Sequence, residues 1–242
     1  MAKRALFLAV LLALSASAAG APVIVTRESK ALDFNYQWPA EAASVPSLQR
    51  HLQSDMTKAL RQARSDAEGD AKQARANHYP FRRHSYSLNW ELAGQTDRLL
   101  SLRGDLGFDT NGAHPNSATK ALLWDRKLGN SVTVSSLFAR SADLATITRA
   151  QYCRALDAER LKRREGERLT GEFAQCPKYG ELAIIPDDRD HDGRFDRLLF
   201  VASPYVAGPY FEGEYQVVER VSPRLMRALK PVYRSSFETQ PQ

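Results

Sequence analysis

Apolar and polar residues alternate in several short segments of this chain and recur with a helical period in one long segment. Residues 32–38, LDFNYQW, place every second side chain on an apolar face, which is the period of a half-buried β-strand. The aligned residues are Leu32, Phe34, Tyr36 and Trp38. Residues 84–94 repeat this pattern. The sequence therefore predicts one strand near the N-terminus, ended by Pro39, and another in the middle of the chain.

Pro46 opens a long segment in which apolar residues recur every three or four positions. These residues are Leu48, Leu52, Met56, Leu60, Ala63, Ala67, Ala71 and Ala74. Proline is favoured in the first turn of a helix, so we expect a long amphipathic helix that begins here. The opposite face carries both acids and bases, and the apolar face thins from leucine to alanine. This composition favours a helix packed on a sheet over a helix on a membrane surface.

The remaining segments return mostly to the period of strands. Runs at residues 97–108, 117–129 and 131–138 are separated by turns, which indicates antiparallel pairing. Further strands are expected at residues 181–186, 195–203 and 215–221. A second helix is expected from a Ser141 cap to about Arg168, and Ser222 followed by Pro223 should begin a short final helix. The predicted fold class is α+β, with a mostly antiparallel sheet packed against the long N-terminal helix and a second helix.

The N-terminus has the pattern of a secretory signal peptide. Lys3 and Arg4 precede the apolar run Ala5–Leu14, and small residues with A-x-A sites follow. The run is shorter than the roughly 20 residues of a membrane-spanning helix, so cleavage is favoured over an uncleaved anchor. We expect residues 1–21 to be removed and the mature chain, without a membrane span, to be periplasmic or secreted. The mature chain divides into residues 22–83, the first strand and the long helix, and residues 84–242.

Composition narrows the class of partner only slightly. The chain is 43% hydrophobic and 26% charged, which is ordinary for a globular protein. Its formal charge is +6, and it falls to +4 without Lys3 and Arg4, because residues 1–21 contain no acid. Most basic residues are interleaved with acids, as on solvated surfaces. No zinc-finger, RNA-binding or phosphate-loop pattern is present, so no nucleic-acid partner is expected.

Cys153 and Cys176 are the two cysteines of the chain. An even number of cysteines in an exported chain indicates a disulfide, which the chain-entropy model values at about 3 kcal/mol for this spacing. The alternative, a catalytic or metal-binding cysteine, has no C-x-x-C motif or Cys/His cluster to support it. We therefore predict a Cys153–Cys176 bridge.

An acidic segment at residues 188–196 is the strongest signal for a metal. Asp188, Asp190 and Asp192 precede a glycine as in the D-x-D-x-D-G start of a calcium loop, and Asp196 falls at the ninth position. The twelfth position holds Leu199 where a calcium loop has glutamate, and the flanking segments are predicted strands. A polar hairpin tip is therefore the preferred interpretation. Calcium is the one cofactor that the sequence leaves open.

Two segments rich in turn residues carry candidate binding side chains. Tyr205, Tyr210 and Tyr215 lie among glycine and proline, where they could form a stacking platform for a sugar or a peptide, or pack on the sheet. Asn111 and His114 lie in the segment DTNGAHPN, where an asparagine–glycine pair suits a turn. We take these five residues as candidate ligand-binding residues.

These segments also carry a resemblance to a known family. GFDTNGAHPNSATKALLWDRKLGNSVTVSSLF and PYVAGPYFEGEYQVV resemble the exported domain of unknown function found in the anti-sigma factor RsiV and beside the deacetylase domain of PdaC-type proteins. Matching positions are Gly112, Ala113, His114, Gly129, Leu137, Phe138, Tyr205, Gly208, Tyr210 and Gly213. Asn111 stands where the family has a glycine. The resemblance covers residues 84–221, and the upstream strand and helix are similar to the smaller domain that often precedes it.

The resemblance implies binding at the cell envelope without catalysis, because this domain of the family is not known as an enzyme. Peptidoglycan or a lysozyme-like protein is the implied partner. No serine elbow, H-E-x-x-H motif or triad is present, so no catalytic residue is assigned, and His114 is expected to pack or hydrogen-bond at its turn. The alternative is a metal-dependent cell-wall hydrolase or deacetylase, with a metal held by Asp188, Asp190, Asp192 and a histidine.

Overall fold

The computed structural model describes residues 20–140, 143–168 and 170–239. The predicted signal peptide lies outside the described residues apart from its last two positions, and so does the predicted helix cap Ser141. Among the described residues, no helix is long and apolar enough to cross a membrane.

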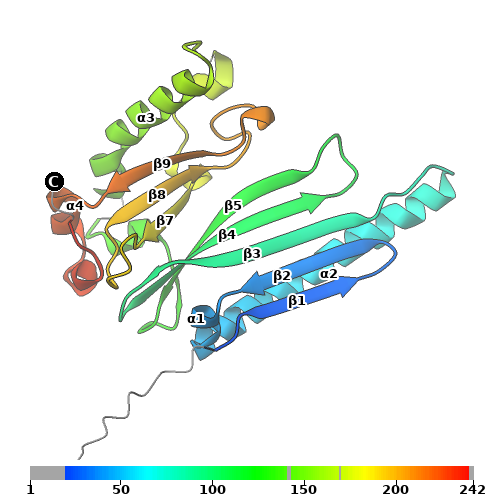
Figure 1. Ribbon diagram of the computed structural model, residues 1–242, viewed down its shortest axis with the longest axis horizontal. Coiled ribbons are helices and arrows are strands. Elements are labelled where there is room, and N and C mark those ends of the chain that lie inside the picture. The colour runs from blue at the N-terminus through cyan, green and yellow to red at the C-terminus, as the bar shows by residue number, and fades with distance from the viewer. Residues whose placement is uncertain (1–19, 141–142, 169, 240–242) are drawn as a thin grey trace, which may run out of the picture.

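A six-stranded sheet forms the larger part of the fold (Figure 1). Its strands are β1 (Val23–Glu28), β2 (Leu32–Trp38), β3 (His84–Gln95), β4 (Leu99–Asp109), β5 (Asn116–Asp125) and β6 (Asn130–Val132), in that spatial order. β2 and β3 are parallel, and all other neighbours are antiparallel. Parallel neighbours need a crossover connection, which α1 (Ala40–Ala43) and α2 (Pro46–Ala76) provide. The long helix therefore follows from the pairing of β2 with β3.

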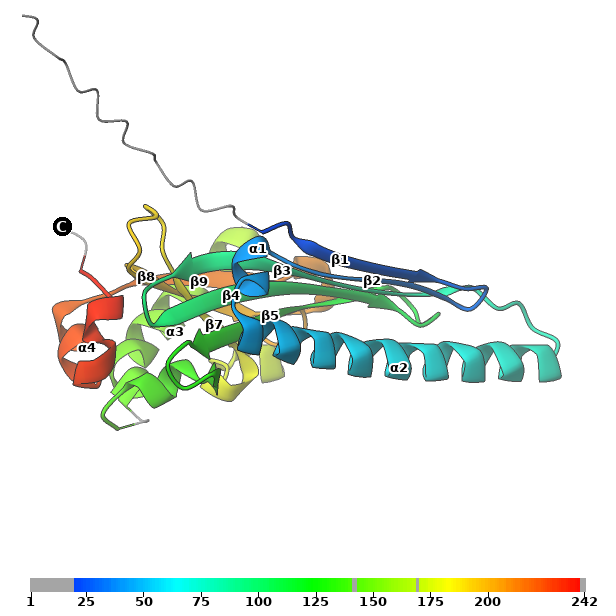
Figure 2. The ribbon, with the colours of Figure 1, turned by 90° about the horizontal axis from the view of Figure 1, so that it is seen from below.

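α2 lies along one face of this sheet (Figure 2). Leu48 and Leu52 of its first half and Ala67 and Ala74 of its second half are buried, as the spacing predicts. A cleft of about 580 Å³ lies between the middle of α2 and the sheet, with Ala63 among its lining residues. The helix and the sheet are therefore not packed closely along their whole length.

The C-terminal half adds a smaller antiparallel sheet and further helices. Its strands are β7 (Ala183–Asp187), β8 (Arg197–Ala202) and β9 (Tyr215–Arg220), in the order β7-β8-β9. α3 (Asp143–Arg163) packs on β9, and β7 lies against β3, β4 and β5. α4 (Pro223–Ala228) begins at Ser222, whose Oγ accepts a hydrogen bond from the Leu225 amide at 3.2 Å, as the predicted cap requires. Short 3₁₀ helices are η1 (Val134–Leu137), η2 (Gly171–Ala174), η3 (Tyr179–Glu181), η4 (Tyr210–Glu212) and η5 (Pro231–Ser236).

Two hydrophobic cores share the central strands of the large sheet. The N-terminal core lies against α2 and contains Leu100 and Trp124, while the C-terminal core lies under the small sheet and contains Leu99 and Leu123. Neighbouring residues of a strand point to opposite faces, so each pair of consecutive residues serves both cores. The predicted α+β class, with a mostly antiparallel sheet, a long N-terminal helix and a second helix, is confirmed.

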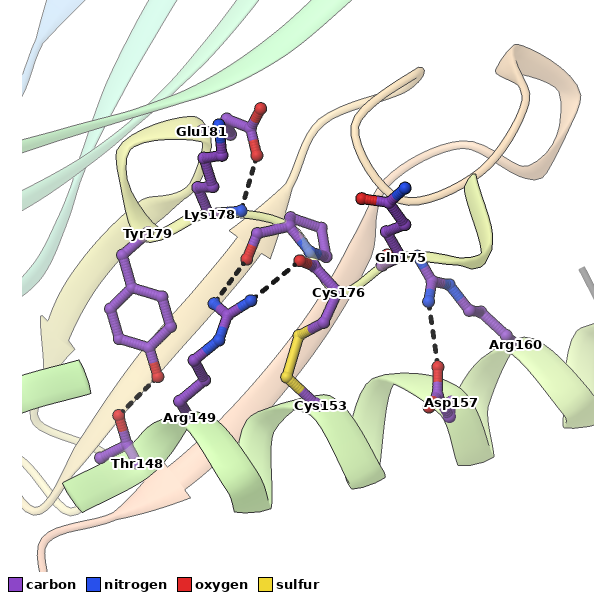
Figure 3. The surroundings of a disulfide bond; sticks show 11 residues. Thr148, Arg149, Cys153, Asp157, Arg160, Gln175, Cys176, Lys178, Tyr179 and Glu181 are labelled. Carbon is purple, nitrogen blue, oxygen red and sulfur yellow. Dashed lines mark hydrogen bonds and ion pairs between the residues drawn. A yellow bond between two sulfur atoms is a disulfide. The ribbon is translucent and has the colours of Figure 1, made fainter. Parts of the chain in front are cut away.

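The predicted Cys153–Cys176 disulfide is present and joins α3 to the loop before β7 (Figure 3). Arg149 of α3 donates hydrogen bonds to the carbonyl oxygens of Cys176 and Pro177 at 3.1 and 3.0 Å. Arg160, eleven residues further along α3, donates to the Gln175 carbonyl at 3.0 Å. The bridge is therefore one of several contacts that hold this loop to the helix.

Two predicted elements differ from the structure. α3 ends at Arg163, five residues before the predicted end, because Glu165 and Gly166 adopt positive φ and the Gly166 amide donates to the Leu161 carbonyl at 2.8 Å. The strand predicted over residues 131–138 is reduced to β6 and followed by η1. There the Thr133 side chain accepts a hydrogen bond from the Ser136 amide, so hydroxyl groups replace strand pairing.

Candidate functional site

An aromatic cluster forms where the β4–β5 loop meets the β8–β9 loop, which lie at the same end of the two sheets (Figure 1). The β4–β5 loop supplies His114, and the β8–β9 loop supplies Tyr205 and Tyr210. We call these three residues the aromatic platform. The His114 and Tyr210 rings stack with centroids 3.7 Å apart and planes 20° apart. Tyr205 stacks beside both rings, with centroids 6.1 Å from His114 and 5.7 Å from Tyr210.

Hydrogen bonds fix the orientation of the platform. Nδ1 of His114 lies 2.8 Å from the Pro115 carbonyl oxygen, and Nε2 lies 2.9 Å from the Tyr205 hydroxyl. A carbonyl oxygen can only accept, so Nδ1 carries the proton, and in the neutral ring Nε2 accepts from the tyrosine. The Tyr210 hydroxyl also donates to the Pro115 carbonyl, at 2.6 Å. Nε2 of His114 thus joins the two loops, and Nδ1 fixes the ring within its own loop.

The backbone of both loops is shaped for this meeting. Asn111 has φ 65°, as the predicted turn requires, and its side-chain amide donates to the Arg82 carbonyl at 2.7 Å, which attaches the turn to the segment before β3. Tyr205 has φ 71°, an uncommon conformation for a residue with a side chain. Such residues cluster at functional sites, where the surroundings hold them in place. Asn111 therefore shapes the β4–β5 loop, and Tyr205 is held so that its ring faces His114.

Tyr215 lies beneath the platform at the start of β9, where it is buried. Its hydroxyl donates to the Glu212 carboxylate at 2.5 Å, and the Arg163 guanidinium lies 4.0 Å from the centre of its ring. Burial, together with the Glu212 charge, raises the pKa of Tyr215 to about 12. Of the candidate binding residues, Tyr215 thus supports the β8–β9 loop from within the core.

Two acids tie the β8–β9 loop to the rest of the molecule. Glu214 accepts hydrogen bonds from Arg103 of β4 at 2.8 Å and from the Thr119 hydroxyl of β5 at 2.6 Å. Glu212 contacts Arg164 at 2.5 Å. The loop that carries Tyr205 and Tyr210 therefore connects strands of the small sheet and also contacts strands of the large sheet.

Exposure of the platform is uneven. Tyr205 is 52% exposed, and the next residue after Tyr210, Phe211, is 82% exposed. His114 and Tyr210 are half-buried. Phe211 is not among the residues predicted from the sequence to bind a ligand, although a large apolar residue in a glycine- and proline-rich loop is a signal for one. Tyr205 and Phe211 are thus the most exposed aromatic side chains of these loops.

The acidic segment forms the connection between the antiparallel strands β7 and β8, as predicted for a hairpin tip. Carboxylate oxygens of Asp188, Asp190 and Asp192 lie within 4.8 Å of one another. Burial raises the pKa of Asp188. Asp196 does not belong to this cluster. It is buried, and its carboxylate accepts a hydrogen bond from the Arg189 amide at 3.2 Å.

The other histidines singled out from the sequence lie away from these sites. His84 is buried at the start of β3, with its Nε2 3.3 Å from the Asp70 carboxylate of α2. His78 follows the end of α2 and has φ 55°. In the described structure the hydrogen-bonding partners of His114 are a carbonyl and a tyrosine, which make no acid–base triad with it.

Part of the chain matches the model of a known protein family. Residues 25–117, from β1 to the start of β5, match the model of a family described as deacetylase PdaC. No curated protein matches the chain. The matched region crosses the predicted boundary at residue 84 and includes β3 and β4.

Solved structures share the fold over most of the chain. A DUF3298 family protein from Pseudomonas aeruginosa PAO1 aligns with a TM-score of 0.56 and 14% identity, covering 90% of this chain and 97% of the other. A DUF3298 family member from Bacteroides fragilis NCTC 9343 aligns with a TM-score of 0.51 and 14% identity, covering 90% and 98%. At this identity the likeness concerns the fold alone. The chain is thus similar to the PdaC family over residues 25–117 and shares its fold with the two DUF3298 structures.

Proposed function

We propose that this chain is an exported, non-catalytic binding protein of the cell envelope and that the aromatic platform contacts the glycan of peptidoglycan. The observation that carries the proposal is the stack of His114, Tyr205 and Tyr210, in which Tyr205 is exposed to solvent, with the exposed Phe211 next to Tyr210 in the chain. Aromatic side chains provide flat apolar area with a polar edge, which suits the faces of sugar rings. The Cys153–Cys176 disulfide is typical of a protein outside the cytoplasm and supports export.

The rigidity of the platform also supports a binding role. Its rings come from loops that are tied to both sheets through Glu214 and Pro115, so the rings are ordered before a ligand arrives. Preorganisation lowers the entropy cost of binding. A glycan strand needs such a surface because each sugar contributes little affinity by itself.

Charge favours peptidoglycan over a lysozyme-like protein as the partner. Without residues 1–21 the chain carries a formal charge of +4. Lysozymes of the common type are basic, so two positive proteins gain no long-range attraction, whereas an anionic wall polymer does. The lysozyme-like partner is therefore the second outcome that the binding experiment distinguishes.

The test is co-sedimentation of the purified protein with peptidoglycan sacculi. Tyr210→Ala and Phe211→Ala should each reduce the affinity of the protein for sacculi by about tenfold, because each substitution removes one aromatic ring from the contact. Tyr79→Ala is the matched control, since Tyr79 is an exposed tyrosine in the segment between α2 and β3. Equal sedimentation of all variants, or binding to lysozyme in place of sacculi, would contradict the glycan assignment.

The rival function, a metal-dependent hydrolase or deacetylase, predicts turnover of purified peptidoglycan. We expect no release of muropeptides or acetate above background from the wild type with added divalent metal. Activity that disappears in His114→Ala or Asp190→Asn would make this protein an enzyme.

A further inference from the structure

We propose that the loop between β7 and β8 binds a calcium ion through Asp188, Asp190 and Asp192, with Glu238 of the C-terminal segment as a fourth acid. The three aspartates gather oxygens within 4.8 Å of one another. Calcium takes six to eight oxygen ligands, and carboxylates at alternate positions before a glycine are a common way to supply them. The inference is independent of the proposed function, because the aromatic platform is built from other loops.

Asp188 gives evidence that is separate from the clustering of acids. Its side chain is 4% exposed, and although one oxygen accepts from the Gly193 amide at 3.0 Å, the other, Oδ1, has no hydrogen-bond partner within the described structure. Buried polar atoms in folded proteins are nearly always satisfied, so an unmatched carboxylate oxygen calls for an explanation. A cation between the three carboxylates provides one.

Arg194 partly neutralises the negative charge of the loop. One nitrogen of its guanidinium lies 3.2 Å from Asp192 and 2.8 Å from Glu238. The loop itself contains four aspartates against two arginines, so it remains acidic even with Arg194 in place. A single arginine thus holds two carboxylates from segments that are distant in the chain and brings Glu238 close to Asp192.

Glu238 supplies what the sequence motif lacks. The twelfth position of the loop is Leu199, which is buried between the two sheets and has no ligand atom. The Glu238 amide donates to the Phe195 carbonyl at 3.0 Å, which fixes the C-terminal segment beside the loop. The acid that a calcium loop takes from its twelfth residue is therefore available from another segment.

The type and number of ligands predict which ion binds and how tightly. All of the ligands are carboxylate oxygens, which suit a hard cation, and calcium accepts a less regular ligand geometry than the octahedron that magnesium requires. Without the usual glutamate in the loop, we expect the affinity of extracellular calcium modules, with Kd on the order of 10⁻⁴ to 10⁻³ M.

The test uses the full mature chain, freed of metal by a chelator, in calorimetric titration with CaCl₂ and in thermal unfolding with and without 5 mM CaCl₂. We expect a sub-millimolar Kd and a Tm increase of about 3 °C with calcium. Asp190 is exposed, so Asp190→Asn should abolish both effects without disturbing the fold. Asp66→Asn, which changes an exposed aspartate of α2 by the same charge, should retain both effects.

Glu238→Gln separates the contribution of the C-terminal segment. We expect its calcium Kd to rise by about tenfold while some binding remains. An unchanged Kd would remove Glu238 from the site. No heat and no Tm increase at 10 mM CaCl₂, or an equal increase in Asp190→Asn, would overturn the proposal and leave the loop as a hairpin tip alone.

Discussion

Glu219 of β9 is a single residue whose burial should govern the pH dependence of stability. Its side chain is 4% exposed on the inner face of β9, and its Oε1 has no hydrogen-bond partner within the described structure. Burial raises its pKa to about 7 from the usual 4.5, and the charge of Arg154 opposes this only in part. The folded state therefore favours the protonated acid at pH values where the unfolded chain is already ionised.

This shift predicts that stability falls as the pH rises from about 4.5 to 7. Below 4.5 the acid is protonated in both states and there is no penalty, while above 7 the folded state carries a buried charge. Each pKa unit corresponds to about 1.4 kcal/mol, so Glu219→Gln should stabilise the protein at pH 8, by up to about 3 kcal/mol. At pH 5 its stability should be close to that of the wild type.

Denaturant unfolding at pH 5 and pH 8 measures this difference. Glu68→Gln is the control, because Glu68 is an exposed glutamate of α2 whose loss should have the same small effect at both pH values. An equal difference between Glu219→Gln and the wild type at the two pH values would show that the acid is not perturbed.

Residues that act locally could be predicted from the sequence, whereas contacts between distant residues could not. The turn at Asn111 and the cap at Ser222 follow from the chemistry of a few neighbouring residues. The contact of His114 with Tyr205 joins residues 91 positions apart, and no local pattern encodes it. The sequence therefore pointed to all three residues of the aromatic platform without predicting that they stack on one another.

At the scale of elements, α3 is attached to the following loop by a covalent bond and by arginine side chains. The Cys153–Cys176 bridge and the hydrogen bonds from Arg149 and Arg160 all reach the same loop (Figure 3). The end of α3 illustrates the limit of pattern reading. The polar residues beyond Arg163 continue a helical composition, but Gly166 stops the helix through its backbone conformation.

Loss of the disulfide should lower stability without removing the fold. The double variant Cys153→Ser, Cys176→Ser should lose about 3 kcal/mol of unfolding free energy, because the bridge restricts the unfolded chain. The arginine contacts should keep the loop in place, so the circular dichroism spectrum should be unchanged. Adding a reductant should cause the same loss in the wild type and none in the double variant. A double variant as stable as the wild type would show that the bridge is dispensable.

At the scale of the whole molecule, the large sheet joins the two halves of the chain. The predicted boundary at residue 84 falls between β2 and β3, which pair with each other in parallel. Leu99 and Leu100, next to each other in β4, point into different cores. The strand periods indicated the strands, but which strands pair and which faces they cover depend on contacts that the periods do not contain.

The shared sheet predicts a single unfolding transition for both halves. All three tryptophans, Trp38, Trp90 and Trp124, lie in the N-terminal core, so their fluorescence reports on that core alone. Leu225 of α4 lies buried in the C-terminal core. Leu225→Ala should leave a cavity that costs about 2–5 kcal/mol and should still shift the tryptophan midpoint, because losing one core exposes the sheet that covers the other.

Fluorescence and circular dichroism, followed in the same denaturant series, distinguish one cooperative unit from two independent domains. For a single cooperative unit, both signals of Leu225→Ala move together to a lower midpoint. Leu128→Ala, at an exposed leucine, should leave both signals unchanged. If the halves were independent domains, the fluorescence midpoint would stay at the wild-type value while circular dichroism split into two steps. Joint movement is expected because β3, β4 and β5 cannot keep one face packed while the other loses its cover.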